Sequence, residues 1–247
     1  MSPPASPPRF LDAGDGGLVI ELGQSIDPAI SAQVMALDAA LAARRLEGVR
    51  EQVPSYRSLL VMFDPLVTSR QAIAAAVQAL WPPPPLPTAD ITLWRVPVLY
   101  GGAAGADLAF VAATHGLSEE AVVRLHAGAA YRVYMIGFAP GFAYLGGLPA
   151  ALATSRRSHP RPATPPGSVS IGGEQTAVSP PLPIPSGWHL IGRTPVRSYD
   201  PARESRPVLF APGDHIRFEP VGTAEFEALS AAAEAGDPVA RAERLAA

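Results

Sequence analysis

The chain has 247 residues, of which 48% are hydrophobic and 17% charged, a composition typical of a globular protein with a sizeable core. With 19 basic and 22 acidic residues, the net charge of -3 argues against binding to nucleic acid or an anionic membrane through a basic surface. Cysteine is absent, which excludes disulfides, thiolate nucleophiles and cysteine metal sites.

The first 85 residues predict a small α+β domain. Apolar patterns indicate strands at 10–11, 18–22 and 58–63, and helices at 28–46 and 70–80. Asp27 before Pro28 is typical of a helix N-cap followed by a first helical residue, and Ser69 has the same capping chemistry. Two strand-then-helix units of this kind pack as one α+β layer.

A run of four prolines at 82–85 cannot continue a helix and predicts a stiff connector, where we place the domain boundary. The second domain, residues 86–222, begins with a predicted strand at 91–100 and helices at 107–116 and 119–127. Short apolar segments separated by Gly and Pro follow, at 131–138, 168–171, 188–191, 208–210 and 216–218. This texture predicts a mainly β barrel, followed by a helical tail over 223–247.

Several common catalytic signatures are missing from the sequence. It contains no nucleophile elbow, no zinc-binding H-E-x-x-H helix and no Walker A loop, and its five histidines are not paired at metal-ligand spacing. We therefore expect no metal site. Lysine is also absent, so any bound anion must meet arginine, backbone amides or helix N-termini. Residues 1–8 lack the pattern of a signal peptide, and we expect a cytoplasmic protein.

Three segments contain candidate binding residues. The stretch YRVYMIGFAPGFAYLGGLP, residues 131–149, places Phe138 among glycines that let the backbone turn, with Arg132 nearby. The aromatic residues are equally explained as a core corner of the barrel, and Arg132 as a structural arginine. We keep both as candidate substrate-binding residues.

The second segment, RRSHPRPATPPGSVSIGGEQ at 156–175, holds Arg161 among stiffening prolines and Gln175 after two glycines. A fixed guanidinium and an amide are suited to a carboxylate or lactam ligand. A solvated basic loop explains Arg156 and Arg157 equally well. The third segment, GWHLIGRTP at 187–195, predicts a strand on which His189 and Arg193 share a side and can face one ligand. A histidine that forms hydrogen bonds within the core explains His189 equally well.

These segments, with AGDGGLVIELG, VPSYRSLLVMFDPL, PPGSVSIGGEQT and APGDHIRF, occur in a fixed order along residues 10–220. In this arrangement the chain resembles the family that includes the B subunit of 5-oxoprolinase, the first subunit of certain allophanate hydrolases, and the sporulation kinase inhibitor KipI. The resemblance implies a small α/β domain followed by a cyclophilin-like β-barrel.

The resemblance also implies a function within a larger assembly. It implies a second, cyclophilin-like subunit of the 5-oxoprolinase C type and a third of the A type, which together open 5-oxo-L-proline to L-glutamate. ATP, with magnesium, is then the cofactor at the level of the complex, and the chain alone is expected to be inactive. Two alternatives stay open, namely a regulatory inhibitor of a sensor histidine kinase and a subunit of an allophanate or urea-type amidohydrolase.

Overall fold

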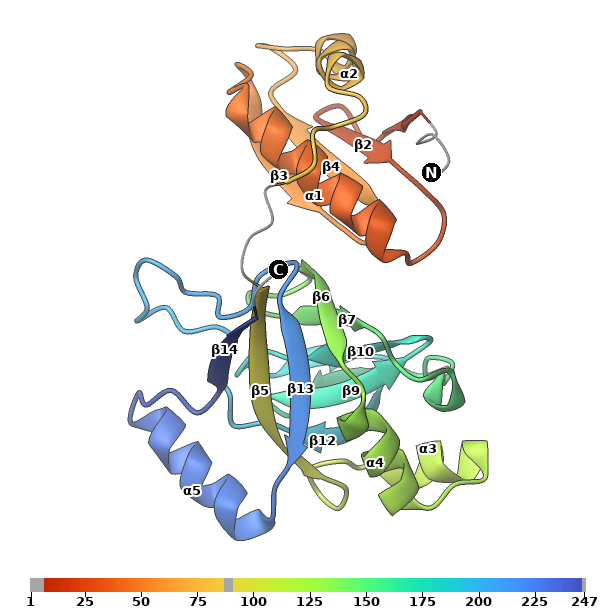
Figure 1. Ribbon diagram of the computed structural model, residues 1–247, viewed down its shortest axis with the longest axis vertical. Coiled ribbons are helices and arrows are strands. Elements are labelled where there is room, and N and C mark those ends of the chain that lie inside the picture. The colour runs from red at the N-terminus through yellow and green to blue at the C-terminus, as the bar shows by residue number, and fades with distance from the viewer. Residues whose placement is uncertain (1–6, 87–90, 246–247) are drawn as a thin grey trace. The chain divides into compact units, whose positions relative to one another are not determined.

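The computed structural model describes residues 7–86 and 91–245, and the chain divides into two compact units, Met1–Ala89 and Asp90–Ala247 (Figure 1). The sequence placed the boundary at the proline run 82–85, a few residues before this division. We describe each unit by itself.

Unit 1 is a four-stranded antiparallel sheet, in the order β1-β2-β4-β3, packed against two helices. Its elements in chain order are β1 (Arg9–Asp12), β2 (Gly17–Glu21), α1 (Pro28–Ala43), β3 (Val49–Pro54), β4 (Ser58–Phe63) and α2 (Arg70–Ala79). Asp27 accepts a hydrogen bond from the backbone N–H of Ala29 and so caps α1, and Ser69 caps α2 through Ala72. Both predicted helix starts are therefore confirmed.

Unit 2 contains the remaining strands and helices. They are β5 (Ile91–Tyr100), α3 (Leu108–His115), α4 (Glu119–Gly128), β6 (Tyr131–Ile136), β7 (Ala143–Gly146), a 3₁₀ turn (Ala150–Leu152), β8 (Arg161–Thr164), β9 (Ser168–Gly172), β10 (Gln175–Val178), β11 (Ile184–Ser186), β12 (His189–Arg193), β13 (His215–Pro220), α5 (Thr223–Glu234) and β14 (Arg241–Leu245).

Seven of these strands close into a barrel in the order β12-β9-β10-β7-β6-β13-β5, and β5 pairs with β12 to complete the ring. The closing seam is short and joins Gly192 to Tyr100 and Arg193 to Leu99. Only β13 and β5 run parallel among these paired strands, so the barrel is mixed. The predicted barrel is confirmed, and β8 and β11 form a separate two-stranded ribbon beside it.

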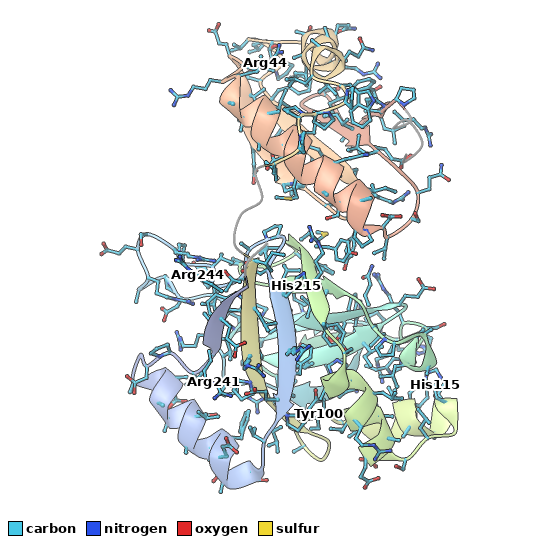
Figure 2. All side chains as sticks on the ribbon, viewed as in Figure 1. Arg44, Tyr100, His115, His215, Arg241 and Arg244 are labelled. Carbon is cyan, nitrogen blue, oxygen red and sulfur yellow. The ribbon has the colours of Figure 1, made fainter. Side chains whose placement is uncertain are left out.

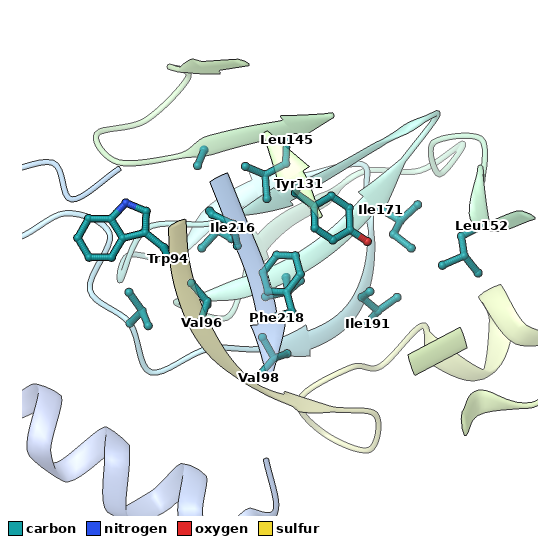
Figure 3. Close-up of a cluster of buried hydrophobic side chains, with 14 of the residues drawn as sticks. Trp94, Val96, Val98, Tyr131, Leu145, Leu152, Ile171, Ile191, Ile216 and Phe218 are labelled. Atoms are coloured by element: carbon teal, nitrogen blue, oxygen red, sulfur yellow. The ribbon is translucent and has the colours of Figure 1, made fainter. Parts of the chain in front are cut away.

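Large apolar side chains from nearly every barrel strand fill the interior (Figure 3). Tyr131, Leu145, Ile171 and Ile191 have no or almost no exposed surface. Burial at this level accounts for the short apolar segments of the sequence, because each strand contributes an inward-facing stripe.

Within this apolar interior, a row of hydrogen-bonded polar side chains is centred on His126, which is fully buried. Thr176 Oγ1 donates to the carbonyl of Ser170, so it accepts from Nε2 of His126 at 3.0 Å. The other ring nitrogen, Nδ1, accepts a hydrogen bond from the hydroxyl of Tyr100 at 2.8 Å. His126 is thus a neutral imidazole with both nitrogens satisfied, and burial lowers its pKa from 6.5 to about 3.

The predicted helical tail over 223–247 is corrected in its last part. α5 ends at Glu234, and β14 then pairs antiparallel with β5 from Arg241 to Leu245. Two ion pairs fix this strand, Arg95 with Glu243 and Arg241 with Glu219. In both pairs the two residues lie far apart in the sequence. The predicted strand at 208–210 is also corrected, because Val208 makes only an isolated bridge to Tyr199.

None of the helices in the described part of the chain has the length and apolarity needed to cross a bilayer.

Candidate functional site

The loop after β6 presents an exposed aromatic side chain on a strained backbone. Phe138 has a φ of 69°, a left-handed value that side chains with a Cβ rarely adopt, and 65% of its surface is exposed. Gly141 in the same loop has a φ of 77° and lies so close to Ser198 and Tyr199 that a Cβ would collide with them. Strain of this kind clusters at functional sites, so the loop is a candidate.

Phe138 stands at the edge of a cavity of about 270 Å³, which we call the aromatic cavity. It is lined by Phe138, Phe142, Tyr144, Arg156, Arg157, Pro160, Pro185, Ser186, Gly187 and Trp188. The guanidinium of Arg156 lies 5.4 Å from the centre of the Trp188 ring, a cation–π distance. Apolar walls with two cationic groups suit a small ring that carries a carboxylate.

Asp107, immediately before α3, holds the arginine loop in place. Its carboxylate accepts hydrogen bonds from Arg161 at 2.7 Å and from Arg157 at 3.2 Å, and its other oxygen accepts from the backbone N–H of Leu190 at 2.8 Å. Burial acts to raise the pKa of Asp107, but the hydrogen bonds and positive charges outweigh it and hold the pKa below its ordinary value. One carboxylate therefore faces two guanidinium groups.

A second cavity of about 510 Å³, which we call the histidine groove, shares Arg156 and Arg157 with the aromatic cavity. Its lining is Phe110, Thr114, Ala153, Thr154, Ser155, Arg156, Arg157, Ser158, His159 and His189. His189 is buried and stacked on the ring of Phe110, with ring centres 4.8 Å apart. His115, labelled in Figure 2 at the end of α3, bonds Thr154 of the same lining.

The six predicted binding residues do not meet in one cavity of the described chain. Phe138 lines the aromatic cavity and His189 the histidine groove, while Arg193 lines a third cavity beside Phe226. Arg161 lies next to the groove, bound to Asp107. Their role in substrate binding stays a prediction.

The other two predicted residues lie on separate strands. Gln175 begins β10 opposite Gly172, and Arg132 lies on β6 opposite His215, with its guanidinium 5.9 Å from the ring of Tyr134. Neither lines the aromatic cavity or the histidine groove among the described residues.

The predicted common face of His189 and Arg193 is corrected by an irregularity in β12. Its register against β9 shifts between Leu190 and Gly192, so simple alternation of side chains breaks there. As a result, His189 Nε2 donates to the carbonyl of Ser155, whereas Arg193 Nε donates to the carbonyl of Pro166.

Sequence reasoning missed the contribution of Asp107 and understated that of Arg156 and Arg157. The position of Asp107 at a helix start is the expected place for a capping carboxylate, yet its side chain makes no cap hydrogen bond. The carboxylate of Asp107 instead pairs with Arg157 and Arg161, which lie far from it in the sequence. Its role is therefore visible only in the folded chain.

The strain at Phe138 leads to a stability prediction. We expect Phe138→Gly to be more stable than Phe138→Ala by about 1 kcal/mol, because both lose the exposed ring but only glycine adopts a positive φ without a Cβ clash. Thermal melting of the two variants measures the difference. Equal melting temperatures, or a less stable glycine variant, would contradict a strained backbone at this position.

Comparison with known proteins places the chain in a family. The family model described as "Carboxyltransferase domain, subdomain C and D" matches residues 8–210. The B subunit of 5-oxoprolinase from Escherichia coli O157:H7 is 41% identical over 208 residues, covering 84% of this chain and 93% of that protein. The corresponding B subunit from Bacillus subtilis strain 168 is 35% identical over 226 residues, covering 87% and 93%.

A solved structure extends the likeness of fold. The urea carboxylase of Kluyveromyces lactis matches with a TM-score of 0.87 over 99% of this chain, although this chain spans only 24% of that one. At 19% identity this likeness concerns the fold alone. From the family model and the two bacterial relatives, the chain belongs to the carboxyltransferase subdomain C and D family, the family of the 5-oxoprolinase B subunits that its sequence motifs predicted.

Proposed function

We propose that this chain is the B-type subunit of a 5-oxoprolinase complex, which opens 5-oxo-L-proline to L-glutamate with hydrolysis of ATP. The observation that carries the proposal is the 41% identity to the Escherichia coli protein across 93% of its length. The coverage matters because it extends over both units of the chain and is not confined to one shared fold element.

The aromatic cavity supports this function on chemical grounds. A five-membered lactam with a carboxylate is small and flat, and it matches a cavity with aromatic walls and two guanidinium groups. We propose that Phe138 touches the lactam ring, and that Arg161 acts as a positioning residue by fixing Asp107. Among the other predicted residues, His189 lines the histidine groove, which adjoins the aromatic cavity because Arg156 and Arg157 line both.

The remaining machinery is assigned to companion chains. Opening a stable amide is assisted by phosphorylation of its oxygen, which needs a nucleotide site and charge stabilisation. This sequence has neither a lysine nor a Walker A loop. We therefore propose that subunits of the A and C types complete the site, that ATP and magnesium bind at the level of the complex, and that the chain alone is inactive. A cyclophilin-like barrel and a cytoplasmic location form part of the same proposal.

Reconstitution tests the function directly. Co-expression with A-type and C-type subunits is expected to give ATP hydrolysis that depends on 5-oxo-L-proline and is lost when this chain is omitted. We expect Phe138→Ala to weaken 5-oxo-L-proline use in that complex, with Arg44→Gln, on the surface of unit 1, as the matched control (Figure 2).

Turnover that is indifferent to this chain would contradict the proposal. Turnover of allophanate in place of 5-oxo-L-proline would favour the urea-type alternative. Tight binding to the dimerisation domain of a histidine kinase, without turnover, would favour the inhibitor.

A further inference from the structure

We propose that the histidine groove is a binding site for a phosphoryl group, separate from the aromatic cavity but adjoining it. Its lining contains two arginines, two histidines and several hydroxyl side chains, and the described residues contribute no carboxylate to it. A cavity that offers donors and positive charge without a competing acid is suited to an anion.

The balance of charge behind the lining leaves a positive excess. Arg157 and Arg161 share the single carboxylate of Asp107, so this cluster carries one net positive charge. Arg156 adds another, because its described contact is the neutral face of Trp188. Two net charges at the edge of one groove match the charge of a phosphate dianion.

His189, a residue of the groove lining, holds an uncommitted polar atom. Its side chain is buried, with 4% of the residue's surface exposed, and Nε2 donates to the carbonyl of Ser155 at 2.9 Å. Nδ1 is buried and has no hydrogen-bond partner among the described residues. Buried polar atoms are nearly always satisfied, so an atom without a partner on a residue that lines a cavity points to a ligand.

The chemistry of Nδ1 narrows the ligand class. Nε2 donates to the carbonyl of Ser155, so a ring with one N–H carries it on Nε2 and presents a lone pair at Nδ1. A carboxylate or a sulfate dianion has no proton to give it. A monohydrogen phosphate has a P–OH that donates to Nδ1 and further oxygens that accept from Arg156 and Arg157. The groove is therefore expected to prefer phosphate to sulfate.

The phosphoryl group could belong to either of two molecules, and the choice of these two rests on the proposed function. One is the terminal phosphate of a nucleotide. The other is a phosphoryl group on the lactam, or the phosphate released from it. Because Arg156 and Arg157 line both cavities, a phosphoryl group in the groove lies beside a ring in the aromatic cavity.

Calorimetric titration of the full chain with inorganic phosphate tests the site. We expect Arg157→Gln to weaken phosphate binding by about tenfold, equivalent to about 1.4 kcal/mol, by removing one charge-assisted donor. His189→Gln should act similarly, since the Gln amide retains a donor toward Ser155 but removes Nδ1. Arg44→Gln serves as the matched control and should bind as the parent chain does.

Arg156→Gln provides a variant that leaves the Asp107 ion pairs intact and is also expected to weaken binding. Melting temperatures check that every variant is folded. Absence of phosphate binding, binding as strong for sulfate as for phosphate, or unchanged binding in Arg156→Gln and His189→Gln would overturn the proposal.

Two further titrations distinguish the sources. Tighter binding of a non-hydrolysable ATP analogue than of phosphate supports the nucleotide. Mutual strengthening of phosphate and 5-oxo-L-proline supports the phosphorylated lactam. If phosphate binds as expected while 5-oxo-L-proline neither binds nor supports turnover in the complex, the phosphoryl site stands and the proposed function fails.

Discussion

Lowering the pH from 6.5 toward 3 is expected to destabilise unit 2 by roughly 1.4 kcal/mol for each pH unit, through the single buried side chain of His126. Burial lowers the pKa of His126 to about 3 in the folded protein, against 6.5 for an ordinary histidine. Between these two values the unfolded chain binds a proton that the folded chain does not. The stability that neutral His126 provides is complete above pH 6.5 and is lost progressively below it.

The matched variant is His126→Gln, which keeps an amide able to bond Tyr100 or Thr176 but cannot titrate. Calorimetric melting from pH 7.5 to pH 4.5 should show a steep decline for the parent chain and a shallower one for the variant. Burial also lowers the pKa of His215, which contributes with the same sign in both proteins and cancels in the comparison. Parallel pH profiles would contradict a neutral, buried His126.

Gly105→Ala is expected to destabilise unit 2 by roughly 3 kcal/mol, because there is no room for a methyl group at this position. A Cβ on Gly105 would overlap the carbonyl of Ile191 on β12 and lie 2.6 Å from the backbone nitrogen of Gly101. Both neighbours are backbone atoms near the short seam that closes the barrel, so relief requires the loop between β5 and α3 to move away from β12. The same shift displaces Asp107 from the N–H of Leu190.

Gly128→Ala is the control for this substitution. Gly128 ends α4, and a Cβ there would meet no atom within 4 Å, so we expect a neutral effect or a gain of up to about 1 kcal/mol. Calorimetric melting of both variants measures the contrast. A Gly105→Ala protein that melts at the parent temperature would show that the seam tolerates movement.

Local features were predictable because their causes lie within a few residues. Asp27 and Ser69 each cap the helix that their position in the sequence predicted. Strand β3 was missed because its sequence, VREQVP, is largely polar and contains no fully buried residue, which leaves no apolar stripe to detect. Likewise, β14 depends on ion pairs with Arg95 and Glu219 that only the folded chain brings together.

The candidate site was less predictable than the fold because it is built from distant segments. Arg161 was predicted to be a fixed arginine, but the prolines around it do not reveal its partner, Asp107, which lies 54 residues earlier. His189 and Arg193 were separated by a register shift that strand alternation does not anticipate. Periodicity describes regular strands, and functional segments often depart from regularity.

The order of strands around β5 also determines when each unit can fold during synthesis on the ribosome. β5 is the first strand of unit 2, yet its neighbours β13 and β14 are the last two strands of the described chain to be synthesised. The four strands of the unit 1 sheet all end by residue 63 and pair only with one another. Unit 1 is therefore free to fold while unit 2 is still being translated. Unit 2 cannot close its barrel until β13 has been made, which leaves the apolar residues of β5 without their final neighbours while the strands between β5 and β13 are synthesised.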